Sequence, residues 1–205
     1  EKAGSGPTFF EMMTAMAFLV FAEHKVDLAI LETGLGGRLD STNVVEPTLS
    51  IITTIALDHC SILGHSIEEI AREKAGIIKQ GVPVLTGWLP DAANLVVETL
   101  AGSHSSPFES MAYKEGIEFP DTNLVGGHQK RNAALAYCSV LKIEKIFPVT
   151  EEKIRKGLTK VRLEGRWQYI EGSPAMILDA CHNQEGAVVL QENLRDYGKS
   201  VIVSL

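Results

Sequence analysis

The stretch that decides the fold is Leu28-Ala-Ile-Leu-Glu-Thr-Gly-Leu-Gly-Gly-Arg-Leu-Asp40. Its first four residues form a continuous apolar run of the kind that builds a buried β-strand. The carboxylate of Glu32 closes that run, and three glycines in the next few positions allow the backbone to approach a ligand closely. The pattern predicts a strand followed by a ligand-facing loop, although a tight connection with a capped end would account for it equally well.

Further apolar runs at 49–55 and 83–86 have the same character, and helical patterns alternate with them. Apolar strands that alternate with helices predict a parallel sheet covered on both faces. Ligands bind at the carboxyl ends of the strands in such sheets, which directs attention to Glu32 and to His59. The predicted helices of this part cover 8–23, which is apolar almost all round and therefore expected to be buried, 66–79 and 91–100.

The second half of the chain continues the α/β pattern after a polar, weakly periodic segment at 103–127. We take that segment as a domain boundary, which predicts domains at 1–125 and 126–205. Expected helices cover 128–141, a segment from 150 onward and 185–197, and expected strands cover 167–170, 175–179 and 199–205.

Composition excludes several classes of protein. Of the 205 residues, 45% are hydrophobic and 22% are charged, which is a globular composition and not a disordered one. The net charge of −7 argues against nucleic acid as a partner. Three widely spaced cysteines argue against a disulfide framework or a zinc ribbon. The longest strongly apolar stretch, 15–22, is too short to span a bilayer, so no membrane partner is expected.

Candidate chemistry gathers at the predicted strand ends. If their strands are neighbours, Glu32 and His59 share one sheet edge, where a carboxylate and an imidazole could hold a divalent cation shared with a phosphate. In the second half, Asn132 lies near the start of a helix, and Asp179 and His182 follow a strand. The latter two could be a metal pair or could contact a ribose and a base. Taken alone, the charged helix at 71–79 is an ordinary solvated face.

Six motifs occur in a fixed order and together are far more specific than any one alone. The chain thereby resembles the folylpolyglutamate synthase/dihydrofolate synthase family, a branch of the Mur ligases. The motifs are Glu-x-Gly-Leu-Gly-Gly-Arg-Leu-Asp-x-Thr-Asn (32–43), Leu-Asp-His-x-x-x-Leu-Gly (57–64), Ala-Arg-Glu-Lys-Ala-Gly-Ile-Ile-Lys (71–79), His-Gln-x-x-Asn-Ala (128–133), Gly-Arg (165–166) and Leu-Asp-x-x-His-Asn (178–183).

The resemblance implies an α/β fold with a three-layer, parallel-sheet, Mur-ligase-like central domain and a smaller Rossmann-like α/β domain, both incomplete here. It also implies an ATP-dependent ligase that phosphorylates a carboxylate and lets the amino group of L-glutamate attack the acyl phosphate. The implied small-molecule partners are folate or dihydropteroate, L-glutamate and ATP with Mg²⁺. A monomer in the cytoplasm is expected, and a mitochondrial targeting segment upstream of Glu1 is left open.

The resemblance also implies roles for individual residues. Glu32 corresponds to a ligand of one Mg²⁺ ion and His59 to a ligand of a second. Lys74 corresponds to the family's carbamylated lysine and, with His59, is the expected catalytic residue. The expected nucleotide contacts are Asn132, Arg166, Asp179 and His182, and the expected folate or pterin contacts are Leu39, Asp40, Ser41, Thr42 and Asn43.

The sequence departs from the family in one important respect: the phosphate-binding pattern G-x-x-x-x-G-K-[ST] does not occur. We therefore expect a chain incomplete at both ends, which by itself does not bind ATP productively. Two alternatives remain open at this point, a metal-dependent hydrolase and a non-catalytic nucleotide-binding fragment. The hydrolase would gather Glu32, His59, Asp179 and His182 into one cluster.

Overall fold

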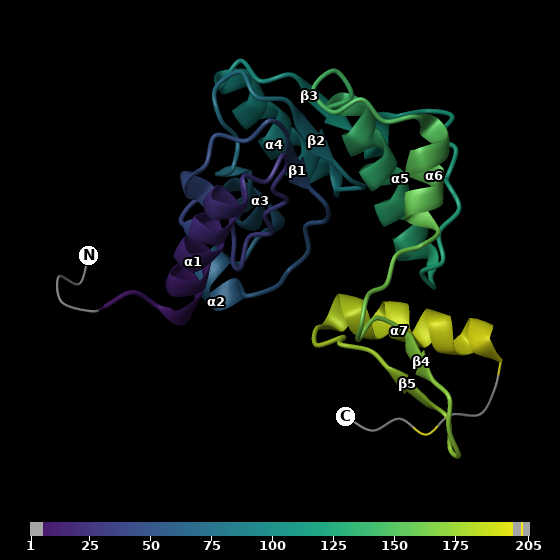
Figure 1. The fold of residues 1–205 in the computed structure, drawn as a ribbon. Helices are drawn as coiled ribbons and strands as arrows, with labels where there is room; N and C mark the ends of the chain where they lie inside the picture. Colours follow the sequence, from purple (N-terminus) through teal and green to yellow (C-terminus); the bar gives the residue numbers. More distant parts are fainter. Residues whose placement is uncertain (1–5, 199–201, 203–205) are drawn as a thin grey trace. The chain divides into compact units, whose positions relative to one another are not determined.

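The computed structural model describes residues 6–198 and residue 202 (Figure 1). The chain divides into two units. Both units are built from alternating segments of the chain, so they do not test the domain boundary predicted between residues 125 and 126. That boundary stays a prediction. Unit 1 comprises Glu1–Ser50, His59–Val84 and Asp91–Phe108, and unit 2 comprises Ile51–Asp58, Leu85–Pro90 and Glu109–Leu205.

Unit 1 contains the three helices expected in the first half of the chain. They are α1 (Phe9–His24), α3 (Ile67–Ala75) and α4 (Asp91–Ser103), together with the shorter α2 (Cys60–Leu63) and the 3₁₀ helix η1 (Ser41–Val44). Two of these helices begin with a capping box, one at Thr8 with Glu11 and one at Ser66 with Glu69. Each satisfies backbone N–H groups that the first helical turn would otherwise leave unpaired.

The expectation that α1 is buried is wrong for the described residues. Only Thr14 of this helix is buried, whereas Phe9 is 74% exposed and Leu19 is 66% exposed. Within unit 1 the helix packs on η1, where the Thr14 Oγ1 and Ser41 Oγ atoms are 2.8 Å apart. The described part of unit 1 thus covers one side of a helix that is apolar on nearly all sides.

The larger sheet has the order β1 (Ser50–Ile52), β2 (Val84–Thr86) and β3 (Phe108–Ser110). β1 and β2 pair in parallel, because the residue numbers of the hydrogen-bonded partners increase in the same direction along both strands. The Ser50 N–H donates to the Pro83 carbonyl at 3.0 Å and the Gly87 N–H to the Ile52 carbonyl at 2.9 Å. The predicted parallel sheet is confirmed, and β3 is an additional strand within the segment that we expected to be a linker.

The strand expected at 28–31 is absent from the structure. These residues have no assigned secondary structure and no ladder partner among the described residues, and Ile30 is 88% exposed. An apolar run supplies side chains for a strand, but a strand also needs a neighbouring backbone to hydrogen-bond with. The prediction rested on the side chains alone.

Unit 2 contains the expected helices α5 (Gly127–Lys142), α6 (Glu151–Leu158) and α7 (Gln184–Tyr197), and the short η2 (Met111–Tyr113). The expected strands are present as β4 (Gln168–Ile170) and β5 (Met176–Leu178). They pair antiparallel, with Gln168 opposite Leu178, because the short turn between them cannot make a parallel crossover. The strand expected at 199–205 lies outside the described residues.

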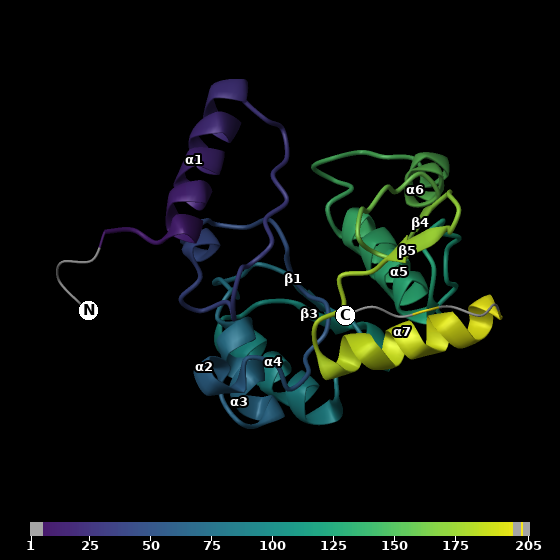
Figure 2. The ribbon, with the colours of Figure 1, turned by 90° about the horizontal axis from the view of Figure 1, so that it is seen from below.

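The core of unit 1 lies where α3 packs on α4, which Figure 2 shows side by side. Ile70 and Ala71 of α3 and Val97 of α4 have no solvent-exposed surface. In unit 2, α5 packs on α6 and buries Leu135 and Ile154. Across the described residues, no helix combines the length and the apolar character needed to cross a bilayer.

Candidate functional site

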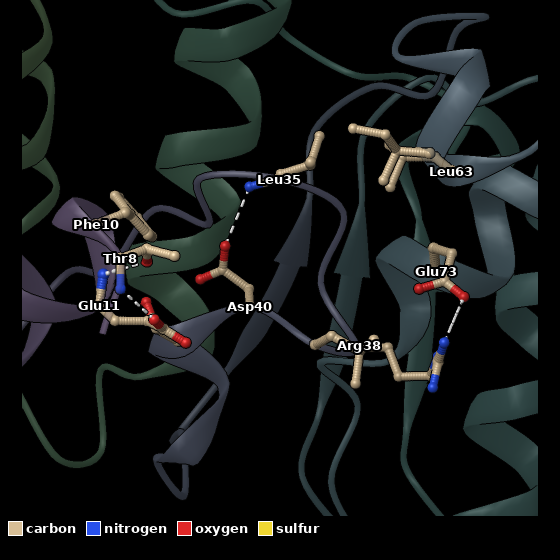
Figure 3. Close-up of a pocket in the computed structure, with 11 residues that line it drawn as sticks. Thr8, Phe10, Glu11, Leu35, Arg38, Asp40, Leu63 and Glu73 are labelled. Carbon is tan, nitrogen blue, oxygen red and sulfur yellow. Dashed lines mark hydrogen bonds and ion pairs between the residues drawn. The ribbon is translucent and has the colours of Figure 1, made fainter. Parts of the chain in front are cut away.

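The glycine-rich loop at 32–43 is folded around the carboxylate of Asp40. Its Oδ2 atom accepts hydrogen bonds from the Gly34 N–H at 2.8 Å and from the Leu35 N–H at 3.0 Å, the second of which Figure 3 shows. Its Oδ1 atom accepts from the N–H and the hydroxyl of Thr42, at 2.9 and 2.6 Å. Partial burial opposes ionisation of this carboxyl, but these four donors outweigh it and lower the pKa of Asp40. Asp40 is therefore an ionised carboxylate that holds the loop in shape through its hydrogen bonds.

The same loop is docked on the C-terminal end of α3. The Arg38 N–H donates to the Glu73 carbonyl at 2.8 Å, and the Arg38 guanidinium pairs with the Glu73 carboxylate at 3.0 Å (Figure 3). The Asn43 amide donates to the Gly76 carbonyl at 2.9 Å, and the Lys79 ammonium donates to the Asn43 carbonyl at 2.9 Å. The motif at 32–43 and the motif at 71–79 thus pack against each other and are joined by hydrogen bonds and an ion pair.

Two glycines permit this close contact. A Cβ atom on Gly37 would lie 2.6 Å from the Lys74 carbonyl oxygen, which is backbone and cannot move without the helix. A Cβ atom on Gly76 would lie 2.4 Å from the Arg38 Cβ atom. The glycines are needed at these positions because two backbones meet there. Their packing places the loop directly against the helical turn that carries Lys74.

A cavity of about 280 Å³ opens beside this loop (Figure 3). Apolar side chains from the loop, from the start of α1 and from α2 form much of its wall, and charged groups interrupt that wall. The loop contributes three of the five residues that we expected to contact folate, Leu39, Asp40 and Ser41. The full lining is Thr8, Phe10, Glu11, Leu35, Arg38, Leu39, Asp40, Ser41, Ile62, Leu63 and Glu73. The other two expected contacts, Thr42 and Asn43, do not line the cavity and make hydrogen bonds that hold the loop.

The expected metal-binding residues lie in unit 1 on separate elements. Glu32 is exposed at the first position of the glycine-rich loop, His59 is exposed at the start of α2, and Lys74 is half-buried on α3. Among the described residues, no three or more histidine, cysteine or acidic side chains gather into a metal-binding group. Mg²⁺ commonly takes one or two protein ligands and completes its shell with water and phosphate oxygens. One carboxylate at Glu32 and one imidazole at His59 would each supply a single protein ligand to its own ion, which suits ions that arrive with a nucleotide.

In unit 2, Asp179 joins two strands at their ends. Its carboxylate accepts from the Trp167 N–H at 2.9 Å and from the Cys181 N–H at 3.0 Å. Arg166 and His182 flank these residues in the chain, and both side chains are exposed. Asp179 therefore fixes the backbone on either side of two exposed groups that could contact a ligand.

The start of α5 contributes the remaining expected contact. Asn132 is exposed, and its amide donates to the Oε1 atom of buried Gln129 at 3.3 Å. Sequence reasoning selected Asn132 from the His-Gln-x-x-Asn motif and passed over His128. The side chain of His128 is half-buried, and its Nδ1 atom is buried without a hydrogen-bond partner among the described residues.

His128 lies in the electrostatic field of the expected nucleotide residues. Burial is the main cause that lowers its pKa, and the positive charges of Arg131 and Arg166 lower it further. The negative charges of Asp179 and Glu192 act in the opposite direction and are outweighed. A neutral imidazole near neutral pH is the result, able to donate at one ring nitrogen and accept at the other.

Known proteins resemble this chain over almost its whole length. It is 45% identical over 213 aligned residues to the dihydrofolate synthase/folylpolyglutamate synthase of Bacillus subtilis, a match that covers 92% of this chain and 50% of that protein. It is 37% identical to the folylpolyglutamate synthase of Lacticaseibacillus casei, over 91% of this chain and 49% of that protein. The chain belongs to the folylpolyglutamate synthase/dihydrofolate synthase family. No family model matches it.

Solved structures of the folylpolyglutamate synthase family share the fold. The apo form of the L. casei enzyme matches with a TM-score of 0.88 at 33% identity, over 98% of this chain and 55% of that one. A folylpolyglutamate synthase complex with AMPPCP and folate matches with a TM-score of 0.88 at 34% identity, over 96% of this chain and 53% of that one. The Mur-ligase-like α/β fold expected from the resemblance is confirmed. The chain spans about half the length of the curated relatives it matches.

Family membership leaves the individual site residues as predictions. The structure brings the glycine-rich loop and the turn around Lys74 together, and the charges of Asp179 and Arg166 both act on His128. The hydrolase alternative needs Glu32 and His59 of unit 1 beside Asp179 and His182 of unit 2, and it stays an untested alternative.

Proposed function

We propose that this chain is part of an ATP-dependent ligase that adds L-glutamate to a folate, as a folylpolyglutamate synthase, a dihydrofolate synthase or both. The observation that carries the proposal is the docking of the glycine-rich loop on the α3 turn at Lys74, beside the cavity. The names of the most similar relatives support it. In this reaction the acceptor carboxylate takes the γ-phosphoryl group of ATP, and the glutamate amino group then displaces phosphate to form the amide.

The cavity of unit 1 is the proposed pterin subsite. A pterin ring has flat apolar faces and a polar edge, and the lining offers both kinds of surface. Phe10 and Leu39 can cover a ring face, whereas Arg38 and Asp40 lie on the polar side of the lining. Because Asp40 already accepts four hydrogen bonds, its proposed role is to shape the cavity more than to bind the ring directly.

The remaining proposed roles concern charge. Glu32 and His59 would hold two Mg²⁺ ions, which when bound neutralise the phosphate oxygens during transfer. Lys74, as a carbamate formed with CO₂, would present an anion in place of its ammonium group. We assign the nucleotide to Asn132, Arg166, Asp179 and His182, and we extend this set to His128 on the basis of its buried, unpaired Nδ1 atom. The enzyme is proposed to act as a cytoplasmic monomer.

The test is glutamate-dependent release of ADP by a full-length protein that contains this sequence. We expect release with dihydropteroate, with a reduced folate or with both, and none when glutamate is omitted. The Lys74→Ala variant should lose at least about 100-fold in kcat, because a positioned charge of this kind contributes several kcal/mol. Short carboxylates such as formate should restore part of that loss by replacing the carbamate.

The matched control is Lys153→Ala, which removes an exposed lysine of α6 that is not among the proposed site residues. Its kcat should equal that of the wild type. If the full-length wild-type protein released no ADP with either acceptor, the proposed function would be excluded.

A further inference from the structure

The side-chain amide of Asn183 uses both of its ends within unit 2. Its Nδ2 atom donates to the Asp58 Oδ2 atom at 2.9 Å, across 125 positions of the chain. Its Oδ1 atom accepts from the Gly186 N–H at 2.8 Å, which makes Asn183 the N-cap of α7. Both Asn183 and Asp58 are half-buried. One amide therefore ties the first turn of α7 to the segment that follows β1.

Only an amide can make both contacts. Aspartate would cap α7 as well as asparagine does, but it would set a second carboxylate against Asp58. Serine would also cap the helix, but its hydroxyl is too short to occupy the position of the Nδ2 atom. The hydrogen bond to Asp58 joins a donor to a carboxylate, and such bonds are about twice as strong as neutral ones.

The backbone next to Asp58 needs external support. His59 has a φ of 49°, in the left-handed region that a residue with a Cβ atom rarely adopts. Such conformations persist where surrounding contacts over-determine them. The histidine side chain makes no capping hydrogen bond to the first turn of α2.

We propose that Asn183 is a positioning residue of the ligase, which holds Asp58 and thereby the backbone that presents His59. Asn183 touches neither substrate nor reacting atoms in this role and acts through the 57–59 segment. The inference rests on the proposed function, since it gives His59 a task for which its orientation matters. It also explains why the Leu-Asp-x-x-His-Asn motif ends in an asparagine.

The test compares variants of a full-length protein that contains this sequence. Asn183→Asp keeps the helix cap and removes the hydrogen-bond donor to Asp58. Asn183→Ser also keeps the helix cap, but its hydroxyl is too short to reach Asp58. The double variant Asp58→Asn/Asn183→Asp restores the hydrogen bond with donor and acceptor exchanged. The matched control is Asn123→Asp, which makes the same change in an exposed amide that bonds Val161 in unit 2. Measurements are kcat, KM for the folate, thermal unfolding and amide hydrogen exchange of the 56–62 peptide.

We expect Asn183→Asp and Asn183→Ser to lower kcat by about tenfold or more, the loss that one charge-assisted hydrogen bond can account for. KM for the folate should stay within about twofold. Exchange at 57–60 should speed up in both single variants. The double variant should regain part of kcat and of the protection from exchange, and Asn123→Asp should match the wild type in kcat.

The proposal is overturned if Asn183→Asp keeps kcat near the wild-type value, or if the double variant regains neither kcat nor protection. Equal exchange in all variants would overturn it even in a protein that showed no ligase activity, so failure of the proposed function and failure of this inference are distinguishable.

Discussion

Single side chains decide the shape of the glycine-rich loop. Asp40 accepts four hydrogen bonds from Gly34, Leu35 and Thr42, and the pKa of its carboxyl is lowered as a result. Sequence reasoning placed Asp40 among the folate contacts, whereas its geometry shows a carboxylate committed to its own loop. The distinction arises because a motif reports which residue type is needed but not which partner it serves.

We expect Asp40→Asn to lower the free energy of unfolding at pH 7 by about 1–3 kcal/mol, because an amide NH₂ group would face backbone donors. The folded-state pKa of Asp40 lies below the unfolded value of 3.8. The carboxylate therefore stabilises the fold above about pH 3.8, and this contribution is lost as the pH falls through the folded pKa. Thermal unfolding at pH 7 and at pH 3 should show a difference from the wild type that narrows at pH 3. A difference independent of pH would contradict the charged role.

Gly37→Ala tests the contact between the loop and α3. Its methyl group would lie 2.6 Å from the Lys74 carbonyl, so the loop and the helix turn must separate. We expect kcat to fall by about tenfold or more, since small displacements of positioned groups cost at least that much. Gly102→Ala is the control, because a Cβ atom there meets nothing within 4 Å, and it should leave kcat unchanged. Equal effects of the two substitutions would refute a special role for Gly37.

At the scale of elements, the helices were predicted well and the strands less well. The capping boxes of α1 and α3 appear where the sequence indicates, because each joins residues three positions apart. The run at 28–31 has the composition of a strand and remains unpaired, and β3 forms in a segment that looked like a linker. A strand depends on a distant partner that local patterns do not contain.

The cap of α3 can be tested against the start of α6. Ser66→Ala removes a hydroxyl that accepts from the Glu69 N–H, and it should destabilise the protein by about 1 kcal/mol. Thr150→Ala removes an N-cap residue whose side chain makes no capping hydrogen bond, so we expect a smaller effect. Chemical denaturation measures both changes. If the threonine variant lost more stability than the serine variant, capping would not explain the stability of α3.

At the scale of the whole molecule, the sequence lacks the phosphate-binding pattern G-x-x-x-x-G-K-[ST]. It matches curated relatives over about half of their length. The candidate groups are divided between the two units, with the cavity and Lys74 in unit 1 and the proposed nucleotide residues in unit 2. We therefore treat catalysis as a property of a longer protein that contains this sequence.

The isolated 205-residue chain should release no ADP under conditions in which the full-length protein does. The physical reason is the missing glycine-rich cradle, whose backbone N–H groups and lysine hold the β- and γ-phosphates. Circular dichroism of the isolated chain serves as the control for folding, since its helices should be visible. Glutamate-dependent turnover by the folded fragment would show that this chain can hold the phosphates without the pattern.

The sequence by itself determined the helices, the parallel sheet, the family and the residues worth testing, because periodicity, capping and ordered motifs act over short spans of chain. Only the tertiary structure decided that Arg38 pairs with Glu73 and that Asn183 reaches Asp58. It also decided that the 28–31 run stays unpaired. The physical reason is the same in each case: a hydrogen bond or an ion pair needs a partner at about 3 Å, and for these groups that partner lies far along the chain or is not supplied by the described residues.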